Sequence, residues 1–325
     1  GSRGLNGAVV ITTKSGKGAT GLGISVSQTF GIDHAFKAPD IQQLYGPGYM
    51  PGQSDADRNG SIWDPHQFTI DQNGDRTLVG VPNFGFGPKY DGQPIRNYDG
   101  TWTTYSPIKN NMLDMYRLGF NSNTNVSIRG GNEKTTFYSS ISYKKANSTT
   151  ENNDFSRYSL LLKGTHKIND WLDVAASVSF ANSQPRNAQR TVGELFVNAN
   201  TNVLNPLFDA NYFRDKYLGE HGGLASTSYG DKYGSVPSSA KNYFFKTDYF
   251  DYTRKETVIR PTFEVNAKIT DWLKFKADAN MNRYVTSVED KQLGTGYANE
   301  GGYYGMSQDI KEQFTVGGTF TASKQ

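Results

Sequence analysis

Long segments in which apolar and polar residues alternate constrain this chain more than any other feature. In VIRPTFEVNAKI, at 258–269, every second residue from Ile259 to Ile269 is apolar, and the residues between are mostly polar. This period of two is typical of a β-strand with one apolar and one polar face. The same split recurs in WLDVAASVSFAN (171–182) and WLKFKADANMN (272–282). Runs of roughly ten to twelve residues suit a tilted strand that crosses a bilayer, and they exceed the mean soluble strand of about five or six.

The alternation predicts eight strands, and the connections between them fall into two kinds. The strands are expected near 20–31, 118–130, 135–148, 155–168, 171–184, 254–269, 272–289 and 307–323. Tight connections are expected at 130–134, 169–170 and 270–271, long ones at 32–117, 185–253 and 290–306, and an intermediate one at 149–154. Short turns on one side and long loops on the other are typical of an outer-membrane β-barrel, with the turns in the periplasm.

Composition is compatible with a barrel and excludes several other classes of protein. A mean hydropathy of −0.64 excludes long apolar helices but not barrel strands, in which only alternate residues are apolar. The chain has no cysteine, so thiolate metal sites and disulfides are absent. The net charge is +3 with interleaved signs, and no basic stripe indicates a nucleic-acid partner.

A short repeat marks the side assigned to the periplasm. KINDWL at 167–172 recurs as KITDWL at 268–273, each time where one strand closes and the next begins. Trp171 and Trp272 would then belong to the aromatic girdle of a membrane barrel at the headgroups. A common amphipathic turn in a soluble sheet is the alternative.

The polar faces carry charges that need water or another polar surface, and eight strands are too few to enclose such a lumen.

Two stretches carry a family resemblance. GSRGLNGAVVITTKSGKG at 1–18 resembles the end of the plug domain in the SusC/RagA family of TonB-dependent outer-membrane transporters, which is marked by a YGSRGANGVVLITTKKGK-like run. The segment from Asn125 to Ser183 resembles the early barrel of the same family, with its Gly-Gly turn, aromatic strand, F-x-R-Y-S strand start and D-W-L turn in order. Much of the family pattern, including a TonB box, most of the plug and more than half of the strands, does not occur in this sequence.

The resemblance implies an all-β fold, part of a transmembrane barrel of about 22 antiparallel strands. Residues 1–19 would be the end of the plug and its link to the barrel, and 20–325 the first part of the barrel wall. The last plug strand would be Ala8–Thr12, and the turn and link would include Arg3, Asn6, Gly7 and Lys14. Arg3 would contact acidic residues of the lumen or be a solvated turn residue.

The family also implies a function and partners. The expected function is TonB-dependent import of a large nutrient, a glycan or an oligopeptide, across the bacterial outer membrane. The expected partners are a SusD-like surface lipoprotein that acts as a lid, TonB through an upstream segment, and outer-membrane lipid. Aromatic residues in the long loops are candidates for binding substrate or lid, since they offer flat apolar faces with polar tips. The candidates are Tyr45, Tyr49, Trp63, Tyr90, Trp102, Tyr105, Tyr212, Tyr217, Tyr229 and Tyr233. About half of the loop aromatics are expected to serve packing within the loops.

Other chemistry is weakly indicated. Asp71, Asn73 and Asp75 have the oxygen-ligand spacing of a calcium loop, but the same stretch also fits a β-hairpin turning at Asn73-Gly74. The four histidines are scattered and no nucleophile motif occurs, so no enzyme and no cofactor are expected. The competing hypotheses are a surface or secreted β-sandwich that binds carbohydrate without transport, and an outer-membrane hydrolase with a Ser/His site.

Overall fold

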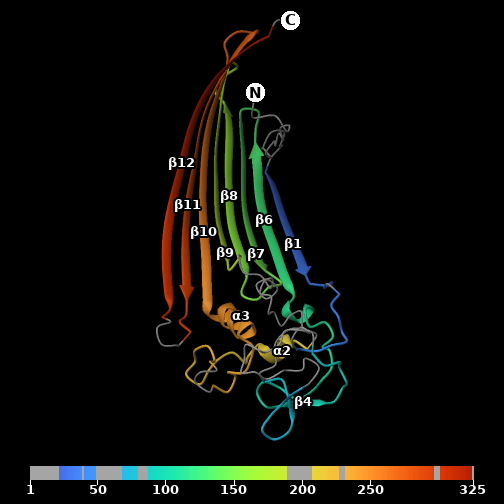
Figure 1. Cartoon of the computed structure of the whole chain (residues 1–325). Coiled ribbons are helices and arrows are strands. Elements are labelled where there is room, and N and C mark those ends of the chain that lie inside the picture. Colours follow the sequence, from blue (N-terminus) through green and yellow to red (C-terminus); the bar gives the residue numbers. More distant parts are fainter. Residues whose placement is uncertain are drawn as a thin grey trace.

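The fold is built on one large antiparallel sheet. The computed structural model describes residues 22–38, 40–48, 68–79, 87–188, 207–226, 231–295 and 301–323. The eight strands of the sheet are β1 (Gly23–Asp33), β6 (Gly119–Gly131), β7 (Thr135–Asn147), β8 (Asp154–Lys167), β9 (Leu172–Arg186), β10 (Phe250–Lys268), β11 (Leu273–Gln292) and β12 (Tyr303–Ala322). Neighbours in this order pair antiparallel, and the strands stand side by side in Figure 1. The eight predicted strands are confirmed, and the sheet has the architecture of part of an antiparallel β-barrel.

The pairing register collects the apolar residues on one face of the sheet. Val265 of β10 lies opposite Val174 of β9 and Ala277 of β11, so the apolar sides of three predicted segments coincide. The pairs of the other strands extend this apolar face across the whole sheet. It includes Ile24, Val26, Phe30, Val126, Ile128, Phe137, Ile141, Leu160, Leu162, Val178, Phe180, Ile259, Phe263, Phe275, Met281, Val285, Ile310, Phe314, Val316 and Phe320. Many of these side chains are exposed, including Phe30 at 78% and Phe314 at 71%.

The opposite face of the sheet is polar. Asn266 lies opposite Asp173 and Lys276, and Thr262 lies opposite Ser177 and Asn280. Because residues directly opposite each other point to the same side of the sheet, the polar sides of all eight strands also form one face, which we call the polar face. The sheet thus separates an apolar surface from a polar one, as the alternation of the sequence predicts.

The tight turns lie at one end of the sheet and the long connections at the other (Figure 1). The repeated hexapeptides fold alike: Ile168 N–H donates to Leu172 O at 2.9 Å, and Ile269 N–H donates to Leu273 O at 3.0 Å. Trp171 and Trp272 both lie at these turns, 55% and 56% exposed. Neither ring belongs to the buried clusters of the described residues, and Trp171 also lines a hollow at this end of the sheet. Membership of an aromatic girdle stays a prediction for both residues.

The long connections form a layer of loops with structure of its own. A small sheet contains β2 (Thr69–Ile70), β3 (Arg76–Thr77), β4 (Pro94–Arg96) and β5 (Trp102–Thr104). The described part of the chain also contains the 3₁₀ turn η3 (Leu113–Met115) and the helices α2 (Ala210–Phe213) and α3 (Ser238–Tyr249). No described helix has the length and apolar character needed to cross a membrane. Among the described residues, two clusters of buried apolar side chains lie mainly in this layer, one around α3 and one around the small sheet.

Two further expectations bear on the fold. The sandwich alternative requires two sheets packed face to face, whereas in the described residues the eight long strands form one sheet and the other sheet has only short strands. The expected plug end and link, residues 1–19 with Arg3, Asn6, Gly7 and Lys14, lie outside the described residues, as do Tyr49, Trp63 and Tyr229.

Candidate functional site

The loop layer contains the described aromatic candidates, and helix α3 organises much of it. The helix follows Pro237, and Ala240, Tyr243, Phe244 and Thr247 are buried. This spacing of three and four residues places one side of the helix against the cluster that also contains Met112, Phe208 and Phe213. The loops therefore have an apolar core, which favours a shaped surface over a set of independent loops.

Burial divides the aromatic candidates into three groups. Tyr105 and Tyr217 are only 1% and 6% exposed, so their rings belong to the cores of the loop layer. Tyr90, Tyr212 and Tyr233 are partly buried and pack against the same cores. Tyr45 and Trp102 remain 44% and 53% exposed. These two rings are the described candidates with the most surface available to a ligand or a lid.

The phenol groups of the cores act as structural donors. The Tyr105 hydroxyl donates a hydrogen bond to Pro88 O at 2.8 Å, and the Tyr217 hydroxyl donates to Asp248. Burial raises the pKa of Tyr105 and of Tyr217 well above the usual value for tyrosine. Both groups therefore stay protonated, and able to donate these hydrogen bonds, at a pH at which an exposed tyrosine ionises.

The stretch DQNGD forms the predicted hairpin turn. Thr69 pairs with Thr77 across β2 and β3, and Gly74 has a positive φ of 84° at the turn. The carboxylates of Asp71 and Asp75 both contact the Arg96 guanidinium, at 3.3 Å and 2.7 Å. A protein cation thus lies where the calcium alternative would place a metal ion. Within the described residues, no group of three or more carboxylate or imidazole side chains has the arrangement of a metal site.

Arg96 also limits access to Trp102. Its guanidinium lies over the Trp102 ring at 4.3 Å from the ring centroid, within the range of a cation–π contact. One face of the exposed indole is thereby occupied, and the ring is held in a fixed orientation. A ligand could stack only on the remaining face.

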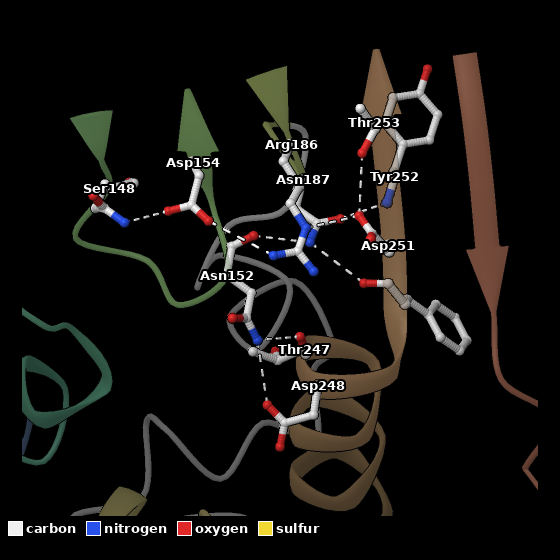
Figure 2. A network of polar contacts seen from close by, with 12 residues as sticks. Ser148, Asn152, Asp154, Arg186, Asn187, Thr247, Asp248, Asp251, Tyr252 and Thr253 are labelled. Atoms are coloured by element: carbon white, nitrogen blue, oxygen red, sulfur yellow. Dashed lines mark hydrogen bonds and ion pairs between the residues drawn. The ribbon is translucent and has the colours of Figure 1, made fainter. Parts of the chain in front are cut away.

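A polar network fastens the loop layer to the ends of the strands (Figure 2). Asn187, at the end of β9, is fully buried, and its side chain accepts from Tyr252 N–H at 2.8 Å and donates to Asn152 O at 2.9 Å. Asn152 in turn donates to Thr247 O of α3 at 2.8 Å. Asn152 and Asn187 both adopt positive φ, near 53° and 52°, which asparagine tolerates better than most residues.

Charged groups reinforce the same junction. Arg186 Nε lies 2.9 Å from Asp251, and its Nη1 lies 3.8 Å from Asp154. Arg214 pairs with Glu151, which ties α2 to the connection between β7 and β8. The network therefore positions the loop layer relative to the sheet. No sequence pattern predicts this network, since its members lie up to about a hundred residues apart.

Comparisons with known proteins locate the fold. No protein-family model and no curated protein matches the chain. Among solved structures, the RagAB peptide importer in the "open-open" state matches with a TM-score of 0.60 and 18% identity, over 98% of this chain and 34% of that chain. The importer in the "closed-closed" state matches with a TM-score of 0.56 and 18% identity, over 94% of this chain and 33% of that chain. The chain thus shares its fold with about a third of the matched chains.

Proposed function

We propose that this chain is part of the wall of an outer-membrane transporter that imports a large nutrient, a glycan or an oligopeptide, in a TonB-dependent manner. The observation that carries the proposal is the broad exposed apolar face opposite the polar face. Full burial of a large apolar side chain contributes about 1.5–3 kcal/mol, so leaving this whole face in water is strongly unfavourable. The hydrocarbon core of a bilayer would provide an apolar environment for this face, and the polar face would then line the lumen.

The dimensions of the apolar face support a membrane location. On β11 it runs from Phe275 to Val285, about 33 Å of strand at about 3.3 Å per residue. A tilt of about 40° reduces this length to about 25 Å, the height of the apolar band of bacterial barrels. Arg283 interrupts the face near its loop-side limit, where it pairs with Glu312 directly opposite at 3.1 Å.

The loop layer would then lie on the outer side of the membrane. There Tyr45 and Trp102 would meet cargo or a SusD-like lid lipoprotein, and TonB would act through a segment upstream of this chain. The likeness to a peptide importer favours an oligopeptide as cargo over a glycan. We propose binding and transport rather than catalysis. The alternative, a surface protein that binds carbohydrate without transport, leaves the apolar face unexplained.

Uptake measurements on the intact protein test the proposal. Cells that carry it together with its lid protein should accumulate labelled oligopeptide or oligosaccharide, and deletion of TonB or collapse of the proton motive force should abolish accumulation. A Tyr45→Ala/Trp102→Ala variant should retain its amount in the membrane and lose cargo affinity. Accumulation that is independent of TonB would refute the energised mechanism, and surface binding without accumulation would favour the alternative.

A further inference from the structure

The polar face is hollowed at the turn end of the sheet, far from the loop layer. The hollow has a volume of about 790 Å³ and is lined by side chains from β7 to β12. Six lysines line it, against three carboxylates: Lys134, Lys163, Lys167, Lys268, Lys274 and Lys276, with Glu133, Asp170 and Asp173. If the sheet is a barrel wall, the hollow faces the lumen near the periplasmic opening.

The lysines of β10 and β11 are arranged in a way that costs stability. Lys268 and Lys274 lie directly opposite each other across the two strands, and Lys276 follows two residues later on the same face. Like charges directly opposite each other destabilise a sheet. Lys268 is compensated by Asp271 at 2.5 Å and Lys276 by Glu264 at 2.6 Å. Lys274 is exposed and has no carboxylate partner among the residues that the structure describes.

The positions of Lys274 and Lys276 along β11 fit an extended acidic peptide. Side chains two residues apart on a strand are separated by about 6.6–6.8 Å, which is the distance between Lys274 and Lys276 along β11. An extended peptide presents its own alternate side chains at this same interval. Glutamate or aspartate at every second position could therefore contact Lys274 directly and lie beside the Lys276–Glu264 pair, and charge-assisted hydrogen bonds are the stronger kind.

We propose that this hollow, centred on Lys274, binds the carboxylates of acidic oligopeptide cargo on its way out of the lumen. The inference rests on the proposed transport function and narrows its substrate class. Lys163, which reaches the hollow from β8, widens the positive surface along which such a peptide can move, whereas Lys167 of the same strand is paired with Asp170 at 2.7 Å. Because the hollow is open to water, each contact is weak and released readily, as passage requires.

A matched pair of peptides tests the proposal in the intact transporter with its lid. One peptide carries Glu at alternate positions, and the other has the same length with Gln at those positions. Uptake and binding of both are measured for wild type, Lys274→Glu and the milder Lys274→Gln. The control is Lys311→Glu, which changes an exposed lysine on the polar face of β12 outside the hollow. Heat-modifiable migration on gels verifies that each variant is assembled. If Lys274→Glu does not assemble, the comparison uses Lys274→Gln.

We expect Lys274→Glu to lower uptake and affinity for the Glu peptide roughly threefold to tenfold, to leave the Gln peptide unchanged, and to weaken the salt dependence of binding. Lys311→Glu should affect neither peptide. Equal uptake of the Glu peptide by all variants would overturn the inference while the transport proposal stands. Equal losses for both peptides would overturn it too, and would indicate that Lys274 holds a plug domain in place. A wild type that imports neither peptide would instead contradict peptide import.

Discussion

Substitution of Val265 by arginine tests the side of the sheet that faces lipid. Val265 lies on the apolar face between Val174 and Ala277. Arginine on the lipid face costs about 2–4 kcal/mol at the bilayer midplane and less toward the interfaces. Val265 is one step along the face from Phe263, the middle of the apolar stretch of β10, so we expect about 2–3 kcal/mol. That is a decrease of about 30-fold to about 150-fold in the folding equilibrium constant.

Asn266→Arg is the matched control on the neighbouring residue. Asn266 lies on the polar face, where its side chain donates to Asp173 and Glu264, each at 2.9 Å. An arginine there stays in water beside two carboxylates, so the change in stability should stay within about 1 kcal/mol. The assay is reversible folding of the urea-unfolded intact protein into phospholipid vesicles, followed by tryptophan fluorescence and heat-modifiable migration. Equal costs for the two variants would refute the assignment of the faces.

Three further predictions concern the two ends of the sheet. Asn187→Ala removes the buried contacts that join the loop layer to the strand ends, so it should lower the free energy of unfolding by about 1–3 kcal/mol and speed proteolysis of the loops. Asn187→Gly keeps the positive φ but loses the same side-chain bonds, so it should behave like the alanine variant. Burial lowers the pKa of Lys241, so the unfolded chain binds this proton more tightly than the folded one. The stability of the loop layer should therefore rise with pH from that lowered pKa toward 10.5. Chemical denaturation at a series of pH values should show this rise in the wild type and not in Lys241→Met. Trp171 and Trp272 should be quenched most strongly by lipids brominated near the headgroup, and quenching by aqueous iodide alone would place them outside the interface.

The sequence predicted the sheet well because its signal is local. The strand expected at 254–269 is β10, Phe250–Lys268, and the strand expected at 272–289 is β11, Leu273–Gln292. Alternation fixes which residues share a face, and turn length fixes the register between neighbours. The strand ends extend further on the loop side because pairing continues there after the apolar alternation has ended.

The loop layer was less predictable because its order depends on contacts between distant segments. Helix α3 was missed, although Ala240, Tyr243, Phe244 and Thr247 have helical spacing that could have revealed it. No pattern in the sequence shows that Asn187 would meet Asn152 and Tyr252. The same limit applies to the aromatic candidates, since residue type alone did not separate buried Tyr105 from exposed Trp102.

The most direct test of the account is a spin-label scan along β10. The chain has no native cysteine, so single cysteines at 257–267 of the intact protein in bilayers can be labelled without background. Odd-numbered positions such as Val265 should be accessible to oxygen dissolved in lipid, and even-numbered ones such as Asn266 to a water-soluble nickel complex. Equal access of the nickel complex to both sets, or an intact protein that stays monomeric in water without detergent, would contradict a wall embedded in lipid.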